Sequence, residues 1–177
     1  MKRTLNLIAV ALSAFISVIA EGAEQLVQPT ALIADSSLSK AALESLTLAA
    51  RRYDTFWHTG DERLAKAALS PAFIDHTLPK GRPQGPEGPL MASKAFRSAV
   101  PDLTCEVEQM IVAGDRVTAL LHFRGHFSGT FGSRAGKGQT VNFMAVDIYR
   151  VQNGLITEDW HLEDNLTLMQ QLGVVAL

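Results

Sequence analysis

Residues 140–164, TVNFMAVDIYRVQNGLITEDWHLED, carry the strongest structural signal in the chain. The dipeptide Asn153-Gly154 is typical of a two-residue type I′ turn, and runs rich in apolar residues flank it on both sides. The stretch therefore predicts an antiparallel hairpin with a definite register. In that register the opposed pairs are Gln152 with Leu155, Tyr149 with Glu158, Asp147 with Trp160, Ala145 with Leu162, and Phe143 with Asp164.

Side chains of a strand alternate between two faces, so this register sorts the hairpin residues into two surfaces. The first surface is expected to be apolar and aromatic with two carboxylates, and it collects Phe143, Ala145, Asp147, Tyr149, Ile156, Trp160, Leu162 and Asp164. The second surface combines Met144, Val146 and Ile148 with Asp159, His161 and Glu163. It can either cover a helix or pair with a second subunit, and the sequence leaves both alternatives open.

Asp164 is the first candidate for chemistry, because burial of a carboxylate on an apolar wall raises its pKa toward neutrality. Such a group can act as a general acid or base. A structural role is the alternative, since Asp164 directly precedes a short helical pattern at 166–172 and Asp is a favoured N-cap. On pattern alone the cap ranks ahead of catalysis. Asp147 has the same ambiguity, because a buried aspartate bonded to a tyrosine or a backbone N–H satisfies the fold without reacting.

Helical patterns come first in the chain. Apolar residues recur at three-to-four spacing over residues 38–57, which predicts a long amphipathic helix. Gly60 ends this helix, and Asp61 begins a second helix that runs through Leu69. A third helix is expected to run to about Val100, before Pro101.

Strand patterns dominate the rest of the chain. A short strand at 73–76 and a Pro/Gly-rich loop at 79–86 precede the third helix, and the later strands are expected at 103–113, 116–127, 140–151 and 155–164. Helices followed by strands indicate an α+β domain.

The first twenty residues have the layout of a secretory signal peptide. Lys2 and Arg3 precede an uncharged, mostly apolar run, and Val18 and Ala20 fit a small-residue cleavage site. Cleavage is expected after Ala20, with cleavage after Ala23 as a less favoured alternative. The predicted organisation is a signal peptide at 1–20, a linker or arm at 21–37 and one domain at 38–177, in a periplasmic or secreted protein without a membrane segment in its mature part.

The charge balance narrows the possible partners. Loss of Lys2 and Arg3 with the signal peptide changes the formal net charge from −2 to −4. An acidic chain of this kind is not expected to bind nucleic acid. Cys105 is the only cysteine, so no disulfide can form within one chain and the residue is expected to pack in a strand.

The sequence predicts neither a metal site nor a phosphate-binding loop. His122 and His126 have the spacing of paired metal ligands on a helix, but on a strand four residues span about 13 Å, too far for one ion. Residues 132–138 are one residue too short for a phosphate-binding loop and precede a strand. Any histidine that reaches a pocket can assist proton transfer, and His76 and His126 rank first among the five.

Several short motifs together resemble one family, the SnoaL-like polyketide (ester) cyclases of the nuclear-transport-factor-2-like superfamily. The motifs are YDTFWHTGD at 53–61, FIDH at 73–76, GPEG at 85–88, PDL at 101–103, GDRV at 114–117, and DIYRVQNGLITEDWHLEDN with the following LMQQLG near the C-terminus. They occur in the family's order across most of the mature chain. The spacing from Trp160 to Asp164, followed by QQLG at 170–173, is the most specific part of the resemblance.

The resemblance implies a cone-shaped fold in which three N-terminal helices close over a curved antiparallel sheet, around an apolar pocket that needs no cofactor. It also implies that Asp164 removes a proton next to a carbonyl group, so that the enolate closes a ring by an intramolecular aldol reaction. Histidines of the pocket assist. The predicted catalytic residues are Asp164, His76 and His126. The predicted substrate-binding residues are Trp160 and Tyr53 from the resemblance, and Phe143, Asp147, Tyr149 and Leu162 from the first surface of the hairpin.

Two classes of function remain open. The first is a cofactor-free enzyme, a cyclase of the lyase or isomerase type, that uses Asp164 as base on a small apolar carbonyl compound. The second is a periplasmic protein that binds an apolar ligand without converting it, and hydrolysis or isomerisation in the same pocket is a further alternative. Asp164 and Trp160 favour the enzyme. Export, and the position of His126 one place early in GHFSG at 125–129, favour the binding protein.

Overall fold

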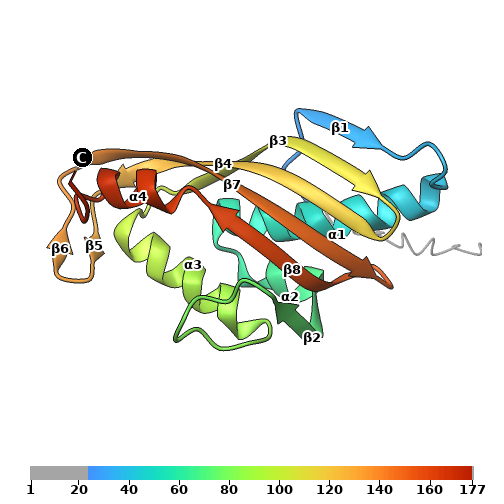
Figure 1. Ribbon diagram of the computed structural model, residues 1–177, viewed down its shortest axis with the longest axis horizontal. Coiled ribbons are helices and arrows are strands. Elements are labelled where there is room, and N and C mark those ends of the chain that lie inside the picture. The colour runs from blue at the N-terminus through green and yellow to red at the C-terminus, as the bar shows by residue number, and fades with distance from the viewer. Residues whose placement is uncertain (1–23, 177) are drawn as a thin grey trace, which may run out of the picture.

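The computed structural model describes residues 24–176, so the predicted signal peptide lies outside the described residues. One curved sheet runs the length of the domain, with helices below it and a short helix at one end (Figure 1). The helices are α1 (Lys40–Thr59), α2 (Glu62–Ala68), α3 (Glu87–Ala99) and α4 (Asn165–Gln171). Among residues 24–176, none of the helices is both long and apolar enough to cross a membrane.

Capping residues set the boundaries of the first two helices close to where the sequence predicts them. Ser39 caps α1, and its side chain accepts a hydrogen bond from the backbone N–H of Ala42. Gly60 ends α1 with a φ of 78°, which glycine adopts without steric strain. Asp61 then caps α2 by accepting from the N–H of Arg63. These caps separate α1 from α2 within two residues.

Six strands form the main sheet in the order β1-β3-β4-β7-β8-β2. They are β1 (Ala31–Ala34), β2 (Leu69–Asp75), β3 (Thr104–Ala113), β4 (Arg116–Phe127), β7 (Gln139–Gln152) and β8 (Leu155–Glu163). The central strands are antiparallel, as predicted, but β1 and β2 pair in parallel with β3 and β8 at the two edges. A separate two-stranded ribbon, β5 (Thr130–Phe131) with β6 (Arg134–Ala135), projects from the connection between β4 and β7.

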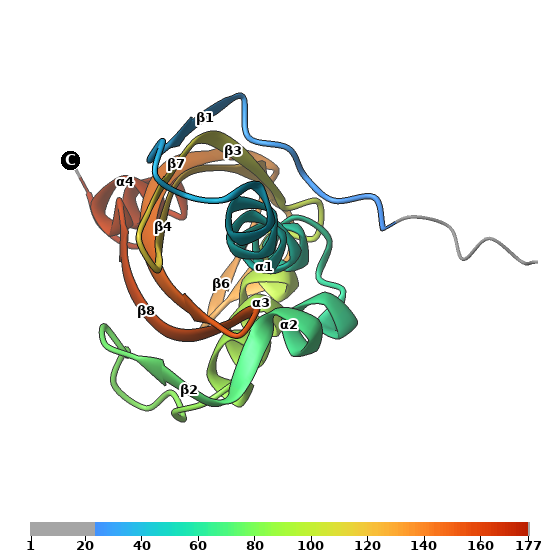
Figure 2. The same cartoon turned by 90° about the vertical axis from the view of Figure 1, so that its right-hand side faces the viewer.

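The sheet curls around α1, which lies inside the concave face (Figure 2). Inward-facing residues of the strands are buried, for example Val117 and Leu121 of β4. Ala49 and Ala50 of α1 are almost fully buried as well, and their small side chains allow the helix to approach the sheet closely. The predicted α+β architecture is thus confirmed, with a fourth helix after the sheet in addition to the three expected before it.

Residues 24–37, which the sequence suggests as a linker or arm, include an edge strand of the sheet. The backbone N–H groups of Thr30 and Asp35 donate to the carbonyl groups of Val107 and Val112, both at 2.9 Å. Strand β1 lies between these two bonds and pairs with β3. The ordered domain therefore begins before residue 38.

The turn of the β7–β8 hairpin forms as predicted. Asn153 and Gly154 both have positive φ angles, 52° and 76°, as a type I′ turn requires. Gln152 and Leu155 lie opposite each other across the turn. The prediction of a hairpin at this place, and of its first pair, is confirmed.

A one-residue bulge beyond the turn makes the rest of the predicted register wrong. Val151 pairs with Ile156 but Arg150 pairs with Glu158, so Thr157 is an additional residue in β8. Every later pair is displaced by one place, and the observed pairs are Tyr149 with Asp159, Asp147 with His161, and Ala145 with Glu163. Because side chains alternate along a strand, this displacement exchanges the two faces of β8.

The exchange turns polar residues toward the inside of the domain. Asp159, His161 and Glu163 share the concave face with Asp147. The outer face carries Trp160 and Leu162 beside Met144, Val146 and Ile148. The bulge therefore decides which side chains a cavity under the sheet can contain.

Candidate functional site

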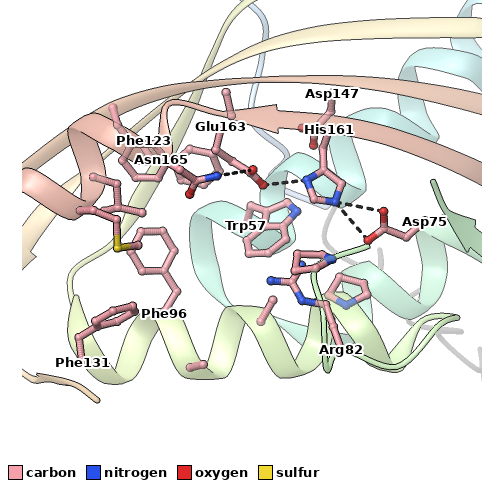
Figure 3. Close-up of a pocket in the computed structure, with 18 of the residues that line it drawn as sticks. Trp57, Asp75, Arg82, Phe96, Phe123, Phe131, Asp147, His161, Glu163 and Asn165 are labelled. Atoms are coloured by element: carbon pink, nitrogen blue, oxygen red, sulfur yellow. Dashed lines mark hydrogen bonds and ion pairs between the residues drawn. The ribbon is translucent and has the colours of Figure 1, made fainter. Parts of the chain in front are cut away.

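A cavity of about 650 Å³ lies between the concave face of the sheet and α3 (Figure 3). Its volume is in the usual range for small-molecule sites. One part of the wall is polar and contains Asp75, Arg82, Asp147, Asp159, His161 and Glu163. The other part is apolar and contains Tyr53, Trp57, Phe96, Phe123, Phe131, Phe143, Leu168 and Met169. A ligand that fits both parts has an apolar body and a polar end.

Three strands contribute the acids and the histidine of the polar wall, and Arg82 comes from the loop before α3. Asp147 comes from β7 and His161 lies opposite it on β8. Asp159 and Glu163 are two residues before and after His161, so their side chains point to the same face. Asp75 ends β2, and the parallel pairing of β2 with β8 brings its carboxylate to His161. The bulge and the parallel edge strand are therefore both needed for this arrangement.

His161 lies between two carboxylates, as Figure 3 shows. Its Nδ1 is 2.7 Å from Glu163 Oε1, and its Nε2 is 3.1 Å from both carboxyl oxygens of Asp75. Both ring nitrogens face acceptors, which suits the doubly protonated imidazolium. Burial lowers the pKa of His161, but the hydrogen bonds and negative charges of its acidic neighbours outweigh burial and raise the pKa to about 9. The imidazolium in turn holds the pKa of Glu163 below its ordinary value despite burial.

A buried chain of polar groups extends behind Asp147. Tyr149 Oη lies 2.9 Å from Asp147 Oδ2 and 2.7 Å from Asp54 Oδ1. A phenol carries a single hydrogen, so it can donate to only one carboxyl group and the other must donate to it. Burial raises the pKa of Asp54 well above its ordinary value, and Asp54 Oδ2 has no partner among the described residues. Asp54 is therefore the protonated acid, which leaves the Tyr149 hydrogen for Asp147.

Asp147 has a pKa close to neutrality. Its side chain is buried, and desolvation raises the pKa, while the charge of His161 and the hydrogen bond from Tyr149 lower it. The negative charges of Glu163 and Asp75 add to the increase, and the resulting pKa is about 7. A carboxyl group with this pKa can accept a proton from a ligand and return it at neutral pH.

Aromatic rings form the opposite part of the cavity. Phe123 and Phe143 stack with 5.1 Å between ring centroids and 10° between planes. Phe96 lies 5.7 Å from Phe143, and Trp57 meets Phe123 edge-on at 6.2 Å. Phe131 of the β5–β6 ribbon borders the same space. These rings offer flat apolar surfaces for a cyclic ligand.

The SnoaL-like polyketide cyclase family matches residues 47–172 of this sequence. The chain belongs to this family. A candidate polyketide cyclase from Bacillus cereus ATCC 10987 is 46% identical over 86% of this chain and 97% of its own, with a TM-score of 0.79. TsrD from Streptomyces laurentii is 25% identical over 78% and 99% of the two chains, with a TM-score of 0.67. IdmH from Streptomyces antibioticus, also a candidate polyketide cyclase, is 26% identical over 73% of this chain and 99% of its own, with a TM-score of 0.65. A search of curated proteins finds no match.

Membership in the SnoaL-like family confirms the resemblance seen in the motifs, and it agrees with the nuclear-transport-factor-2-like fold. It supports a cofactor-free function of the cyclase or isomerase type. Across residues 24–176, no group of three or more His, Cys, Asp or Glu side chains is placed to hold a metal ion.

Some of the residues predicted for the SnoaL-like site do border the cavity. Tyr53, Phe143 and Asp147 are part of its lining. Tyr149 is fully buried behind the wall, where its hydroxyl group contacts Asp147 and its ring meets the ring of Tyr53 edge-on. These four residues lie on α1 and β7, whose facing directions do not depend on the bulge in β8.

Asp164 lies outside the cavity lining, at the N-cap of α4. Its Oδ1 accepts from the backbone N–H of Thr167 at 3.1 Å, and its Oδ2 accepts from the Thr167 hydroxyl at 2.7 Å. These hydrogen bonds hold the pKa of the exposed carboxyl group below its ordinary value. The expected apolar wall and raised pKa at Asp164 are therefore wrong, because the displaced β8 turns Trp160 and Leu162 away. The N-cap, which was the alternative, is present.

The remaining predicted residues lie outside the lining as well. His76 and Trp160 stack on the outer side of the sheet with 4.2 Å between ring centroids, and Leu162 is 74% exposed. His76 faces outward because its neighbour Asp75 faces inward. His126 hydrogen-bonds an exposed aspartate and is itself more than half exposed.

Apart from Asp147, the acidic and basic residues of the polar wall were not predicted for the site. In the FIDH motif, His76 was predicted as a catalytic residue, but the preceding Asp75 is the residue whose side chain borders the cavity. The predicted hairpin had no bulge, and its register put Asp159, His161 and Glu163 on the face that points away from the cavity. No residue type marks Thr157 as the bulge, because a bulge of this kind does not require glycine.

Proposed function

We propose that this SnoaL-like protein is a cofactor-free acid–base enzyme of the cyclase type that acts on a small apolar carbonyl compound. The observation that carries the proposal is the pair at the polar end of the cavity, Asp147 with a pKa of about 7 opposite His161 with a pKa of about 9. Two titratable groups with separated pKa values on one wall can serve as base and acid in the same pH range.

In the proposed reaction, Asp147 removes a proton from the carbon next to the carbonyl group. The electron pair of that C–H bond forms an enolate, whose oxygen is stabilised by the positive charge of His161. The enolate carbon then attacks a second carbonyl carbon of the same molecule and closes a ring. Asp147, now protonated, returns the proton to the new alkoxide, so the product is an isomer of the substrate and no redox partner is consumed.

The aromatic part of the cavity supports the choice of substrate class. Trp57, Phe123 and Phe143 offer apolar surface for the body of the ligand, which leaves its carbonyl end for the polar wall. Tyr149 donates to Asp147 from behind and fixes the orientation of the carboxylate. Fixed orientation of a base contributes to rate because less ordering is needed in the transition state.

The test is exchange of hydrogen at the carbon next to a carbonyl group. α-Tetralone, a bicyclic aromatic ketone, is incubated with the purified protein in D2O containing EDTA, and the α-CH signal is followed by NMR. The wild type should accelerate the loss of this signal, and Asp147→Asn should remove the acceleration. Binding of α-tetralone without exchange contradicts the enzyme and favours the binding protein.

We further propose that the chain is exported and that residues 1–20 are removed. The support is the sequence layout of Lys2 and Arg3 before an apolar run that ends in a small-residue cleavage site. Intact-mass measurement on the periplasmic fraction of the natural host should give a chain that begins at Glu21. A full-length chain in the cytoplasm contradicts this proposal.

Finally, we propose that two copies associate through the outer face of the hairpin. Met144, Val146, Ile148 and Leu162 are exposed there at 39%, 36%, 39% and 74%. Apolar side chains gathered on one sheet face lose contact with water when a second copy covers them, and a twofold pair covers both faces at once.

A further inference from the structure

Asp159 is an exception among the acids of the cavity wall. Its side chain is only 2% exposed and borders the cavity, yet the carboxyl group makes no hydrogen bond and no ion pair with any residue from 24 to 176. Asp75, Asp147 and Glu163 all have such partners. Buried polar groups are almost always hydrogen-bonded, so the missing partner of Asp159 needs an explanation.

The surroundings of Asp159 favour its neutral, protonated form. The groups that face it are Asp75 from β2, Asp147 and Tyr149 from β7, and Asp54 and Tyr53 from α1, with His161 and Glu163 on its own strand. No cation is paired with it in the described chain, and the nearby acids are of like charge. Burial first, and then the charges of Asp147 and Asp75, raise the pKa of Asp159 well above its ordinary value.

We propose that Asp159, as a neutral carboxylic acid, donates a hydrogen bond to the carbonyl oxygen of the ligand at the polar end of the cavity. Asp159 lies opposite Tyr149, and Tyr149 is two residues from Asp147 on the same face. Asp159 and Asp147 are therefore diagonal neighbours, a relation in which side-chain origins are roughly 7 Å apart. A ketone fits this separation, with its oxygen at Asp159 and its α-hydrogen at Asp147.

A neutral donor explains how an acid-rich wall can bind an oxygen that becomes negative. An ionised Asp159 would repel an enolate, whereas the O–H of the acid strengthens its hydrogen bond as charge develops on the oxygen. The site is thus selective for ligands with an acceptor oxygen, such as ketones and esters, over hydrocarbons of the same shape. The catalytic part of this inference rests on the proposed function, but the binding part does not.

The binding experiment compares α-tetralone with tetralin, which has the same bicyclic body without the oxygen. The quenching of Trp57 fluorescence reports binding to the wild type and to the variants Asp159→Asn and Asp159→Leu. Asparagine keeps an N–H donor of similar shape, so Asp159→Asn should bind α-tetralone within about threefold of wild type. Leucine has no donor, so Asp159→Leu should bind α-tetralone about tenfold more weakly, the scale of one hydrogen bond, while its affinity for tetralin stays unchanged.

Two binding results overturn the proposal: Asp159→Leu that binds α-tetralone as tightly as wild type, or Asp159→Asn that loses as much affinity as Asp159→Leu. The second result means that a hydrogen-bond donor at this position is not what holds the ligand. Circular dichroism of both variants checks that they fold.

Infrared spectroscopy tests the protonation state without any ligand or turnover. At pH 7 the carbonyl-stretch band of a protonated carboxyl group should weaken in Asp159→Asn relative to wild type, and it should be unchanged in Asp164→Asn, the exposed control. No difference between Asp159→Asn and wild type also overturns the proposal. Failure of the exchange reaction with a positive infrared result removes the proposed enzyme but leaves Asp159 as a binding donor.

Discussion

The two sides of the β7–β8 hairpin carry the same acidic residue types in opposite surroundings. On the concave side, Asp147 and Asp159 are buried and their pKa values are raised. On the outer side, hydrogen bonds from Arg150 and His76 lower the pKa of Glu158, and those from Thr167 lower that of Asp164 at the strand's end. The difference shows that the face of the sheet on which an acid lies, and not its residue type, separates candidate bases from structural acids.

Substitution of one carboxyl group on each side of the hairpin should have the largest effect on this comparison. Asp147→Asn removes the proposed base and should lower turnover by about 100-fold or more, the scale of general-base catalysis. Asp164→Asn should leave turnover unchanged and the protein equally stable, because Asn and Asp are equally good N-caps. Initial rates of α-proton exchange and thermal melts decide between the two sites. The reverse pattern of rates would restore the catalytic role that the sequence predicted for Asp164.

The pH dependence of the rate should reflect the two groups on the concave face, Asp147 and His161. Turnover requires Asp147 ionised and His161 protonated, so it should rise through pH 7 and fall through about pH 9. His161→Gln should abolish the alkaline fall together with most of the activity. A rate controlled by one ionisation near the ordinary pKa of aspartate would instead point to an exposed acid such as Asp164.

The free energy of unfolding should also depend on pH through Asp147 and His161. Both folded-state pKa values are raised above those of the unfolded chain, so the folded protein holds each proton to higher pH. The stabilising contribution of His161 is complete below its unfolded pKa of about 6.5 and is lost as pH rises through about 9. Melting temperatures should therefore fall across that window in the wild type and change less in His161→Gln.

The smallest effect is expected on the outer face. Leu162→Asp should change the unfolding free energy of a single chain by no more than about 0.5 kcal/mol, because the side chain is 74% exposed. It should nevertheless convert the proposed dimer into monomers in light scattering, since a charge would be buried in the interface. Wild-type protein that is monomeric at high concentration contradicts the proposed association.

Local signals in the sequence were sufficient for most of the fold. Ser39, Gly60 and Asp61 are cap residues with fixed conformational preferences, and Asn153-Gly154 determines its own turn, so these elements were predicted within a few residues. A strand at 73–76 was predicted, but the parallel pairing of the two edge strands was not, because pairing partners far apart in the chain leave no local pattern. The faces of β8 depend on whether one residue is paired, and the pattern of residues 155–163 is compatible with both registers. That single ambiguity moved Asp164 into the predicted site and left His161 out of it.

The parallel edges also bear on the order in which the domain folds. β1 and β2 belong to the first part of the chain but pair with β3 and β8, which emerge from the ribosome much later. Contacts across such long loops form slowly, because the loop must close before the pairing can stabilise it. Asp75 can meet His161 only after the last strand has docked. The cavity is therefore among the last features to form, and a chain in which β8 has not yet docked leaves the edge of β7 unpaired and open to aggregation.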